Sequence, residues 1–249
     1  MSIAEKLQTV AENQQKVYDA GKQAEYDAFW DGYLKHGVSG GLSGSYLFYG
    51  SRWDKNLFRP NQDLIPQSAT SMFESFNMPT TREPIDLVDV CNQLGITIDF
   101  SKSSSLTKCF YNSNISRIGK IVLMASSSLG TSTFANSSRI ETIDEIVFVS
   151  SGHTSNITGT FSNCTGLKNI KFSGGKLKCT INLQWCPLTV ESMKSVISSL
   201  VDCYEAQISP NSYGVYFSDE CWAALEADST SPTGSTWKEY VNQYLLWKV

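Results

Sequence analysis

Apolar positions recur three times at nearly regular spacing in the middle of the chain. Each recurrence starts with Phe, has Asn two residues later, and ends with two aliphatic residues three positions apart: FYNSNISRI, FANSSRIETI and FSNCTGLKNI. A short apolar run follows each stretch, KIVLM, EIVFV and NIKF. The stretches begin 24 and 27 residues apart, in the range of solenoid repeats. The pattern predicts units that each supply a turn, a loop and one strand of a parallel sheet.

In such a stack, each position of a unit lies above the same position of the unit before it. The structural repeat positions are Phe110, Asn112, Phe134, Asn136, Phe161 and Asn163. We expect the phenylalanines to form an aromatic column inside the stack. We expect the asparagines to form a second, inward column that satisfies backbone groups of tight turns. The pattern leaves open whether the first unit begins at Phe73 or near Thr97.

Flanking segments predict elements that cover the two ends of the stack. IDLVDVCNQLG predicts a short helix that ends at Gly95, with ITIDF as a strand after it. LTVESMKSVISSLV predicts a helix that Thr189 caps and that has one apolar face. Farther on we expect a strand at YGVYFS, a helix over DECWAALEAD capped by Ser218, a helix with a Thr236/Glu239 capping box, and a strand at LLWKV.

The first residues advance by alternating steps of four and three between apolar positions, the spacing of a coiled-coil seam. The candidate oligomerisation seam is Ile3, Leu7, Val10, Gln14 and Val17. An amphipathic helix packed on its own domain fits this spacing equally well, so both interpretations stay open. A Gly/Ser-rich stretch, GVSGGLSGSYLFYG, then separates this helix from the rest.

Composition and charge narrow the range of partners. The 249 residues are 41% hydrophobic, enough for a buried core, and the formal net charge is -4. That charge provides no basic field for phosphate backbones, so we expect no nucleic-acid partner. No stretch approaches the roughly 18 uninterrupted apolar residues of a membrane span, and the start lacks the features of a secretory signal. We therefore expect synthesis in the cytoplasm and no membrane insertion.

Candidate chemistry is sparse, and we expect no catalytic, cofactor-binding or metal-binding residue. The two histidines, His36 and His153, are expected in solvated loops. Asp219 and Glu220 open a predicted helix, where negative charge is favourable. The seven cysteines form no Cys-x-x-Cys pair and are expected to be buried, reduced thiols. Ser/Thr/Asn-rich loops at 101–108, 125–133 and 150–160 would line one edge of the stack and suit hydrogen bonding to a glycan or a protein.

At the repeats the chain resembles the BspA-type leucine-rich repeat proteins. FSNCTGLKNI matches their F-x-x-C-x-x-L-x-x-I pattern, whereas the second stretch has Ser137 for Cys and Ile140 for Leu, and the first is one residue shorter. The opening 33 residues and the phrase YGSRWDKNLFRPNQDLIP resemble the front of small proteins encoded by phages and prophages of gut Firmicutes. These resemblances imply a leucine-rich-repeat fold and a location in the virion.

The expected fold class is α/β, a short leucine-rich-repeat solenoid with parallel strands, an N-terminal helix and a C-terminal α/β cap. Four regions follow: a helical attachment or oligomerisation segment (1–36), a Gly/Ser linker and loop-rich entry (37–84), the solenoid (85–187) and an α/β appendage (188–249).

The resulting hypothesis is a non-enzymatic, homo-oligomeric virion protein. Its N-terminal helix would bind other virion proteins, and its repeats would recognise a host-surface glycan or protein. Two alternatives remain: an intracellular bacterial leucine-rich-repeat scaffold with no virion role, and a glycan-active enzyme, which would require paired carboxylates across a cleft.

Overall fold

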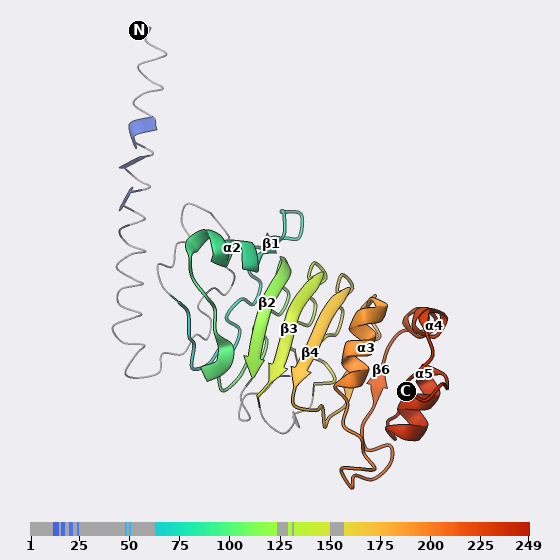
Figure 1. The fold of residues 1–249 in the computed structure, drawn as a ribbon. Helices are drawn as coiled ribbons and strands as arrows, with labels where there is room; N and C mark the ends of the chain where they lie inside the picture. The colour runs from blue at the N-terminus through green and yellow to red at the C-terminus, as the bar shows by residue number, and fades with distance from the viewer. Residues whose placement is uncertain are drawn as a thin grey trace.

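The computed structural model describes residues 12–14, 16, 17, 20, 21, 24, 48, 50, 63–123, 129, 130, 132–149 and 157–249. It is an α/β protein with a four-stranded parallel sheet in the order β1-β2-β3-β4 (Figure 1). These strands are β1 (Ile85–Asp86), β2 (Ile115–Leu123), β3 (Thr142–Phe148) and β4 (Asn169–Gly174). A second, two-stranded parallel sheet is formed by β5 (Ile181–Asn182) and β6 (Val215–Tyr216).

The helical elements are α2 (Leu87–Leu94), η1 (Phe100–Lys102), α3 (Val190–Ser198), α4 (Asp219–Asp228), α5 (Trp237–Glu239) and the π-helical turn η2 (Tyr240–Tyr244). The predicted caps are confirmed. Gly95 ends α2 in the left-handed conformation, Thr189 and Ser218 begin α3 and α4, and Thr236 begins α5 with the expected capping box. Local hydrogen-bonding chemistry therefore sets these boundaries.

The three long strands align as the repeat spacing predicts. Ile118 of β2 pairs with Ile143 of β3, which pairs with Ile170 of β4. All three side chains are buried on the interior face of the sheet. The alignment follows because a one-residue slip would move each strand's apolar side chains to the opposite face.

The phenylalanines form the expected interior column. The column also contains rings from outside the three predicted units. The Phe110 and Phe134 rings stack at 5.5 Å between centroids, and those of Phe134 and Phe161 at 5.3 Å. On the other side, Phe73 stacks on Phe110 at 5.3 Å, and Phe48 stacks on Phe73 at 5.0 Å. Phe73, and not the region of Thr97, therefore continues the aligned positions toward the N-terminus.

The asparagines lie above one another but not inside, so the prediction of an inward column is wrong. Asn112 is half-buried, and Asn136 and Asn163 are exposed. Their backbones are left-handed, with φ of 52°, 62° and 56°. Asn is one of the few residues other than Gly that adopt this conformation readily. The position therefore requires a backbone conformation that Asn tolerates, and its amide does not need to reach interior groups.

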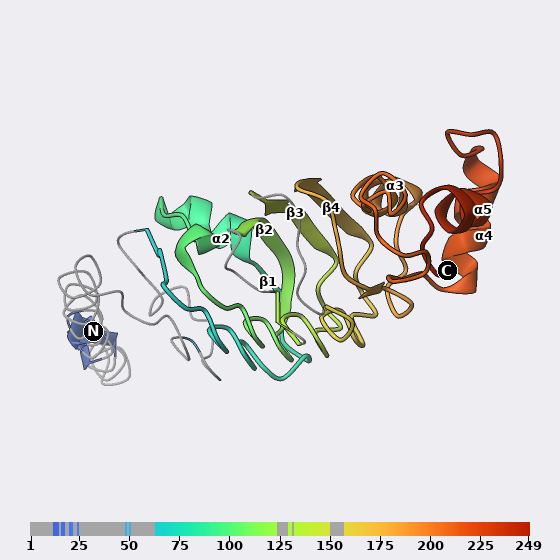
Figure 2. The same ribbon diagram turned by 90° about the horizontal axis from the view of Figure 1, so that it is seen from below.

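Helices lie along the two edges of the sheet, with α2 beside β1 and β2 and α3 beside β4 (Figures 1 and 2). The predicted role of α2 needs correction, because Phe73 and Phe48 extend the aromatic column on the N-terminal side of this helix. β1 pairs with β2 only near Ile115 and Arg117. Helix α2 therefore covers the sheet edge and does not end the aromatic column.

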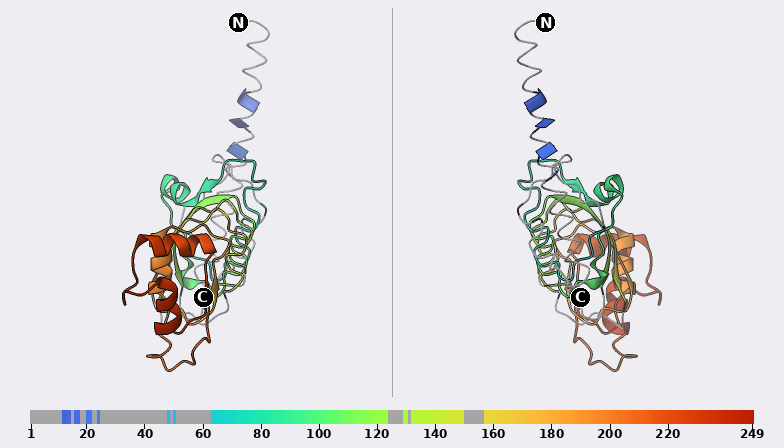
Figure 3. Two further views of the ribbon diagram at one scale, coloured as in Figure 1. Left: turned by 90° about the vertical axis from the view of Figure 1, so that its right-hand side faces the viewer. Right: turned by 90° about the vertical axis from the view of Figure 1, so that its left-hand side faces the viewer.

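Residues 188–249 share one continuous apolar core with the preceding residues, extending from Phe48 to Trp247. Helices α4 and α5 lie beyond α3, at the end of the molecule opposite α2 (Figures 1 and 3). Two predicted strands are reduced to single parallel bridges, Leu64 to Ile98 within ITIDF and Gly214 to Lys248 within LLWKV. No helix in the described part of the chain is long and apolar enough to cross a membrane.

Most of the candidate seam lies outside the described residues. Ile3, Leu7 and Val10 belong to that undescribed part. Gln14 and Val17 are helical and exposed, and 74% of the Val17 surface is accessible. The seam as an oligomerisation surface therefore stays a prediction.

Candidate functional site

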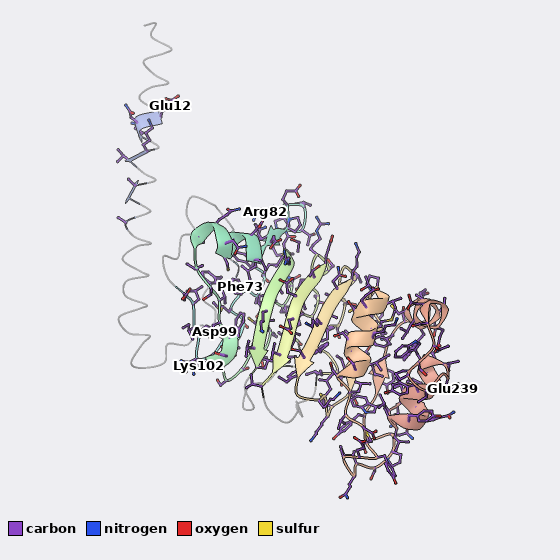
Figure 4. All side chains as sticks on the ribbon, viewed as in Figure 1. Glu12, Phe73, Arg82, Asp99, Lys102 and Glu239 are labelled. Atoms are coloured by element: carbon purple, nitrogen blue, oxygen red, sulfur yellow. The ribbon has the colours of Figure 1, made fainter. Side chains whose placement is uncertain are left out.

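The outward face of the four-stranded sheet carries charged side chains whose sign alternates from strand to strand. Cations lie on β2 (Arg117 and Lys120), anions on β3 (Asp144 and Glu145), and a cation on β4 (Lys171). We call these five residues the charged ladder. The face lies between α2 and α3 and is seen directly in Figure 1. In Figure 4, η1 with Asp99 and Lys102 lies beside the carboxyl end of β2, and Arg82 lies near the opposite end.

Arg117 and Asp144 form a pair of the ladder that is joined by two hydrogen bonds. The guanidinium donates two hydrogen bonds to the carboxylate, from Nε to Oδ1 at 2.8 Å and from Nη2 to Oδ2 at 2.9 Å. Its Nη1 also lies 3.9 Å from a carboxylate oxygen of Asp86 in β1. The hydrogen bond to Asp144 raises the pKa of Arg117. A planar, two-bond pair of this kind holds both side chains in one orientation.

Glu145 forms the second group of the ladder, between two lysines. Its carboxylate lies 3.1 Å from Lys120 Nζ and 3.5 Å from Lys171 Nζ. A hydrogen bond from Ser173, followed by the contact with Lys120, lowers the pKa of Glu145. The carboxylate is therefore ionised at neutral pH, and the ladder keeps its alternating charge.

An irregularity in strand register brings Asp144 and Glu145 to this face together. Between Ile143 and Ile146, β3 has two residues where β4 has only Lys171. Such a bulge bends the strand and re-aims side chains. Because of this bulge, Ile143 and Ile146 of β3 are both buried. The two acids between them reach cations on the neighbouring strands, Asp144 a cation on β2 and Glu145 a cation on β4.

A solvent-open hollow of about 530 Å³ lies where β3 and β4 meet the start of α3. Ile143 and Ile170 are among its lining residues, and its polar lining consists of Thr142, Asp144, Asn169, Lys171, Thr189, Glu191, Ser192 and Ser195. Donors, acceptors and charges of both signs therefore line one depression. This composition suits a polar ligand that makes several directional hydrogen bonds.

Helix α3 holds one wall of this hollow through hydrogen bonds to the edge strand. The Ser192 hydroxyl accepts from the Ile170 amide at 3.0 Å, and the Ser195 hydroxyl accepts from the Phe172 amide at 3.1 Å. The Thr189 amide also donates to the Lys168 carbonyl at 2.9 Å. These bonds satisfy backbone groups that the last strand of a sheet otherwise leaves open, and they fix the helix relative to β4.

The residues singled out from sequence lie elsewhere. The repeat phenylalanines are buried, and the asparagines follow the outer turns, where the Asn163 amide donates to the Asn136 side-chain oxygen at 2.9 Å. Asn136 in turn donates to the Tyr111 hydroxyl at 2.9 Å. These positions are structural, and the charged ladder does not include them.

The Ser/Thr/Asn-rich loop edge is described only in part. In 101–108 and in the described residues of the other two loops, several hydroxyls are directed inward. Ser103 donates to the Pro66 carbonyl at 2.6 Å, and Thr133 donates to the Leu106 carbonyl at 2.9 Å. Both residues are buried, so these hydroxyls stabilise the backbone and do not face a ligand.

A signal for the charged ladder was present in the sequence. Charges interrupt otherwise apolar strands at matching places in successive units, as RIGKIVL, IDEIVF and NIKF. Their sign changes from positive to negative and back to positive. Only the strand register shows that these residues meet across neighbouring strands.

The seven cysteines are unpaired thiols, as expected, and all but Cys91 are buried. Burial raises the pKa of Cys91 to about 11 and that of Cys164 and Cys179 to about 12, each from 9.0. These thiols are neutral near pH 7 and poor nucleophiles. Among the described residues, no group of three or more His, Cys, Asp or Glu is placed to hold a metal ion. His36 and His153 lie outside the residues that the structure describes.

Comparison of the chain with models of known protein families, with curated proteins and with solved structures found no match.

Proposed function

We propose that this protein is a non-enzymatic recognition protein of the leucine-rich-repeat type, which binds its partner through the charged ladder and the hollow beside α3. The observation that carries the proposal is the arrangement of charges of alternating sign, paired across strands, next to an open polar hollow on one sheet face. Complementary charge patterns of this kind favour selective association with a partner. The proposed partner is a host-surface glycan or protein.

Repeated local geometry supports the solenoid interpretation. The aromatic column has one ring in each successive unit, and the second residue after Phe73, Phe110, Phe134 and Phe161 has a positive φ every time. At the third residue after Phe134 and Phe161, a polar hydrogen donor reaches the preceding unit: Ser137 donates to the Phe110 carbonyl, and Cys164 to the Phe134 carbonyl. One backbone plan therefore recurs with different side chains.

The state of the acidic and thiol groups supports a binding role over catalysis. Asp144 and Glu145 are engaged with cations on neighbouring strands. Burial keeps the Cys109 and Cys186 thiols in their neutral form. A general acid or nucleophile needs a pKa matched to its task. The pKa of Glu145 is lowered by its hydrogen bonds, and the pKa values of the Cys109 and Cys186 thiols are raised by burial, so all three move away from that range.

The virion location rests on the resemblance of the opening segment and of YGSRWDKNLFRPNQDLIP to phage-encoded proteins. In this proposal the N-terminal helix attaches the protein to other virion proteins and assembles it as a homo-oligomer. The alternative, an intracellular scaffold, uses the same sheet face for a bacterial partner.

Peptide mass spectrometry on density-purified particles induced from the source strain tests the location. We expect this chain at an abundance stoichiometric with other virion proteins. A chain that is plentiful in the cytosol and missing from particles would exclude the virion role and favour the scaffold.

Binding of the purified, fluorescently labelled protein to host cells tests the sheet face. We expect Lys171→Glu to reduce cell binding at least tenfold, because it reverses a ladder charge at the rim of the hollow. Lys248→Glu makes the same charge change at an exposed position on the last bridge and should leave binding unchanged. Equal binding by the two variants would show that the charged ladder is not the recognition surface.

A further inference from the structure

Trp185 differs from the other tryptophans that the structure describes. Trp222, Trp237 and Trp247 are buried and each packs against another aromatic ring. Trp185 is 50% exposed, and in the described part of the chain its indole makes no ring contact. An indole left half in water forgoes part of its hydrophobic contribution to stability, and half of its surface stays available for contact with a ligand.

The hydrogen-bond pattern of the repeat places Trp185 at an outer turn. The Cys186 amide donates to the Leu183 carbonyl at 2.9 Å, as the Cys164 amide donates to the Phe161 carbonyl at 3.2 Å. By this hydrogen bond Trp185 corresponds to Asn163 one unit earlier, but its backbone does not adopt the positive φ of Asn163. The earlier units place a small polar residue at this position, and this unit places a large flat ring.

Trp185 lines a second open hollow, of about 490 Å³, between residues 184–188 and the first turn of α4. The polar side chains that line it are Thr165, Gln184, Ser218 and Glu220. This hollow is separate from the one on the sheet face, since the two share no lining residue. The lining of this hollow therefore combines one indole with hydroxyl, amide and carboxylate groups.

The lining distinguishes between classes of ligand. Hydrogen bonds with its own backbone and with Ser218 lower the pKa of Glu220, so a negative charge faces the hollow, and no Lys or Arg is among its lining residues. An anionic ligand would be repelled. A quaternary ammonium is bound best by a cage of several aromatic rings, and Trp185 is the one aromatic residue in this lining.

A neutral pyranose fits both features of this hollow. One face of the sugar ring presents C–H groups that pack on an indole, and its hydroxyls can donate to Glu220 and exchange hydrogen bonds with Gln184 and Thr165. We propose that the hollow beside Trp185 is a binding subsite for a neutral pyranose unit of a glycan. This subsite does not depend on the charged ladder or on a place in a virion.

Saturation-transfer NMR with the full-length protein tests the subsite directly. The probes are methyl glucoside, galactoside and mannoside, with methyl glucuronide as the anionic counterpart and choline as the cationic one. We expect transfer to at least one neutral pyranoside, and transfer at least fivefold weaker to methyl glucuronide and to choline. No transfer to any neutral pyranoside, or preferential transfer to methyl glucuronide or choline, would overturn the proposal.

Variants then locate the binding. Trp185→Ala should lower the affinity for the bound pyranoside at least tenfold, Trp185→Tyr should retain part of it, and Gln184→Ala should lower it severalfold. Tyr204→Ala removes an 80% exposed aromatic residue that does not line this hollow and serves as the matched control. Urea unfolding midpoints equal to wild type would show that Trp185→Ala is folded. Undiminished sugar binding by Trp185→Ala would refute the assignment.

Discussion

The hydroxyl of Ser192 in α3 accepts a hydrogen bond from the backbone amide of Ile170 in β4 at 3.0 Å. Ser195, one helical turn later, does the same for Phe172 and also donates to its carbonyl at 3.4 Å. Two serine side chains of α3 therefore accept the backbone hydrogen bonds that a fifth strand would otherwise accept. Because these amides of β4 are already bonded, the sheet edge is protected from pairing with another chain.

Replacing Ser192 by Ala should reduce the free energy of unfolding by about 1–3 kcal/mol, because the buried Ile170 amide would lose its acceptor. Ser198→Ala is the matched control on the same helix, where the side chain is exposed, and should change stability by less than about 0.5 kcal/mol. Urea denaturation followed by circular dichroism measures both. Equal values for the two variants would mean that another group satisfies the amide.

Phe134 has a stacked ring on each side and is fully buried. Phe134→Ala should lower the free energy of unfolding by about 3–5 kcal/mol, through lost burial and the cavity left behind. Phe134→Leu should cost less, because it fills most of that volume. The same urea titration applies, with Tyr204→Ala as the control. A loss below about 1 kcal/mol for Phe134→Ala would show that the column relaxes around the cavity.

The left-handed backbone of Asn136, with φ of 62°, predicts an inverted order of two variants. Asn136→Ala should be about 1 kcal/mol less stable than Asn136→Gly, because Gly adopts this conformation without strain. At the exposed neighbour Arg139, whose φ is not positive, the order should reverse and Ala should be the more stable. Thermal unfolding of the four variants checks both orders. Equal stabilities of Asn136→Ala and Asn136→Gly would show that backbone strain does not matter at this position. Asn136 would then contribute to stability through its side-chain hydrogen bonds.

The buried Cys164 thiol predicts a loss of stability in alkaline solution. Its pKa is about 12 in the folded protein and near its ordinary 9.0 when unfolded. Between these values the folded state keeps the proton and the unfolded state releases it, so stability falls as pH rises from about 9 toward 12. This single group contributes about 1.4 kcal/mol per pH unit above pH 9.

Cys164→Ser is the conservative test, because the preceding unit already has Ser137 in the same role. The variant should show a shallower decrease in the urea midpoint between pH 8.5 and 10.5 than wild type. Slopes that coincide would show that the unfolded and folded thiols ionise alike.

Sequence alone predicted the parts of the fold that depend on a repeated requirement at fixed spacing. The aligned isoleucines of β2, β3 and β4 and the rings of Phe110, Phe134 and Phe161 are such parts, because every unit must bury the same face. The helix boundaries at Gly95, Thr189 and Ser218 were predictable because capping depends on neighbours in the chain. Phe73 was ambiguous because β1, α2 and η1 separate it from Phe110.

Tertiary structure decided which side of each turn faces water and which charges meet. The asparagines of the repeat are compatible with an inward or an outward position, and only the left-handed backbone of each turn places them outside. Arg117 and Asp144 are 27 residues apart, and the exposure of Trp185 depends on where α4 packs. Local sequence encodes periodicity and capping, whereas a surface site forms from residues that only the packing of distant segments brings together.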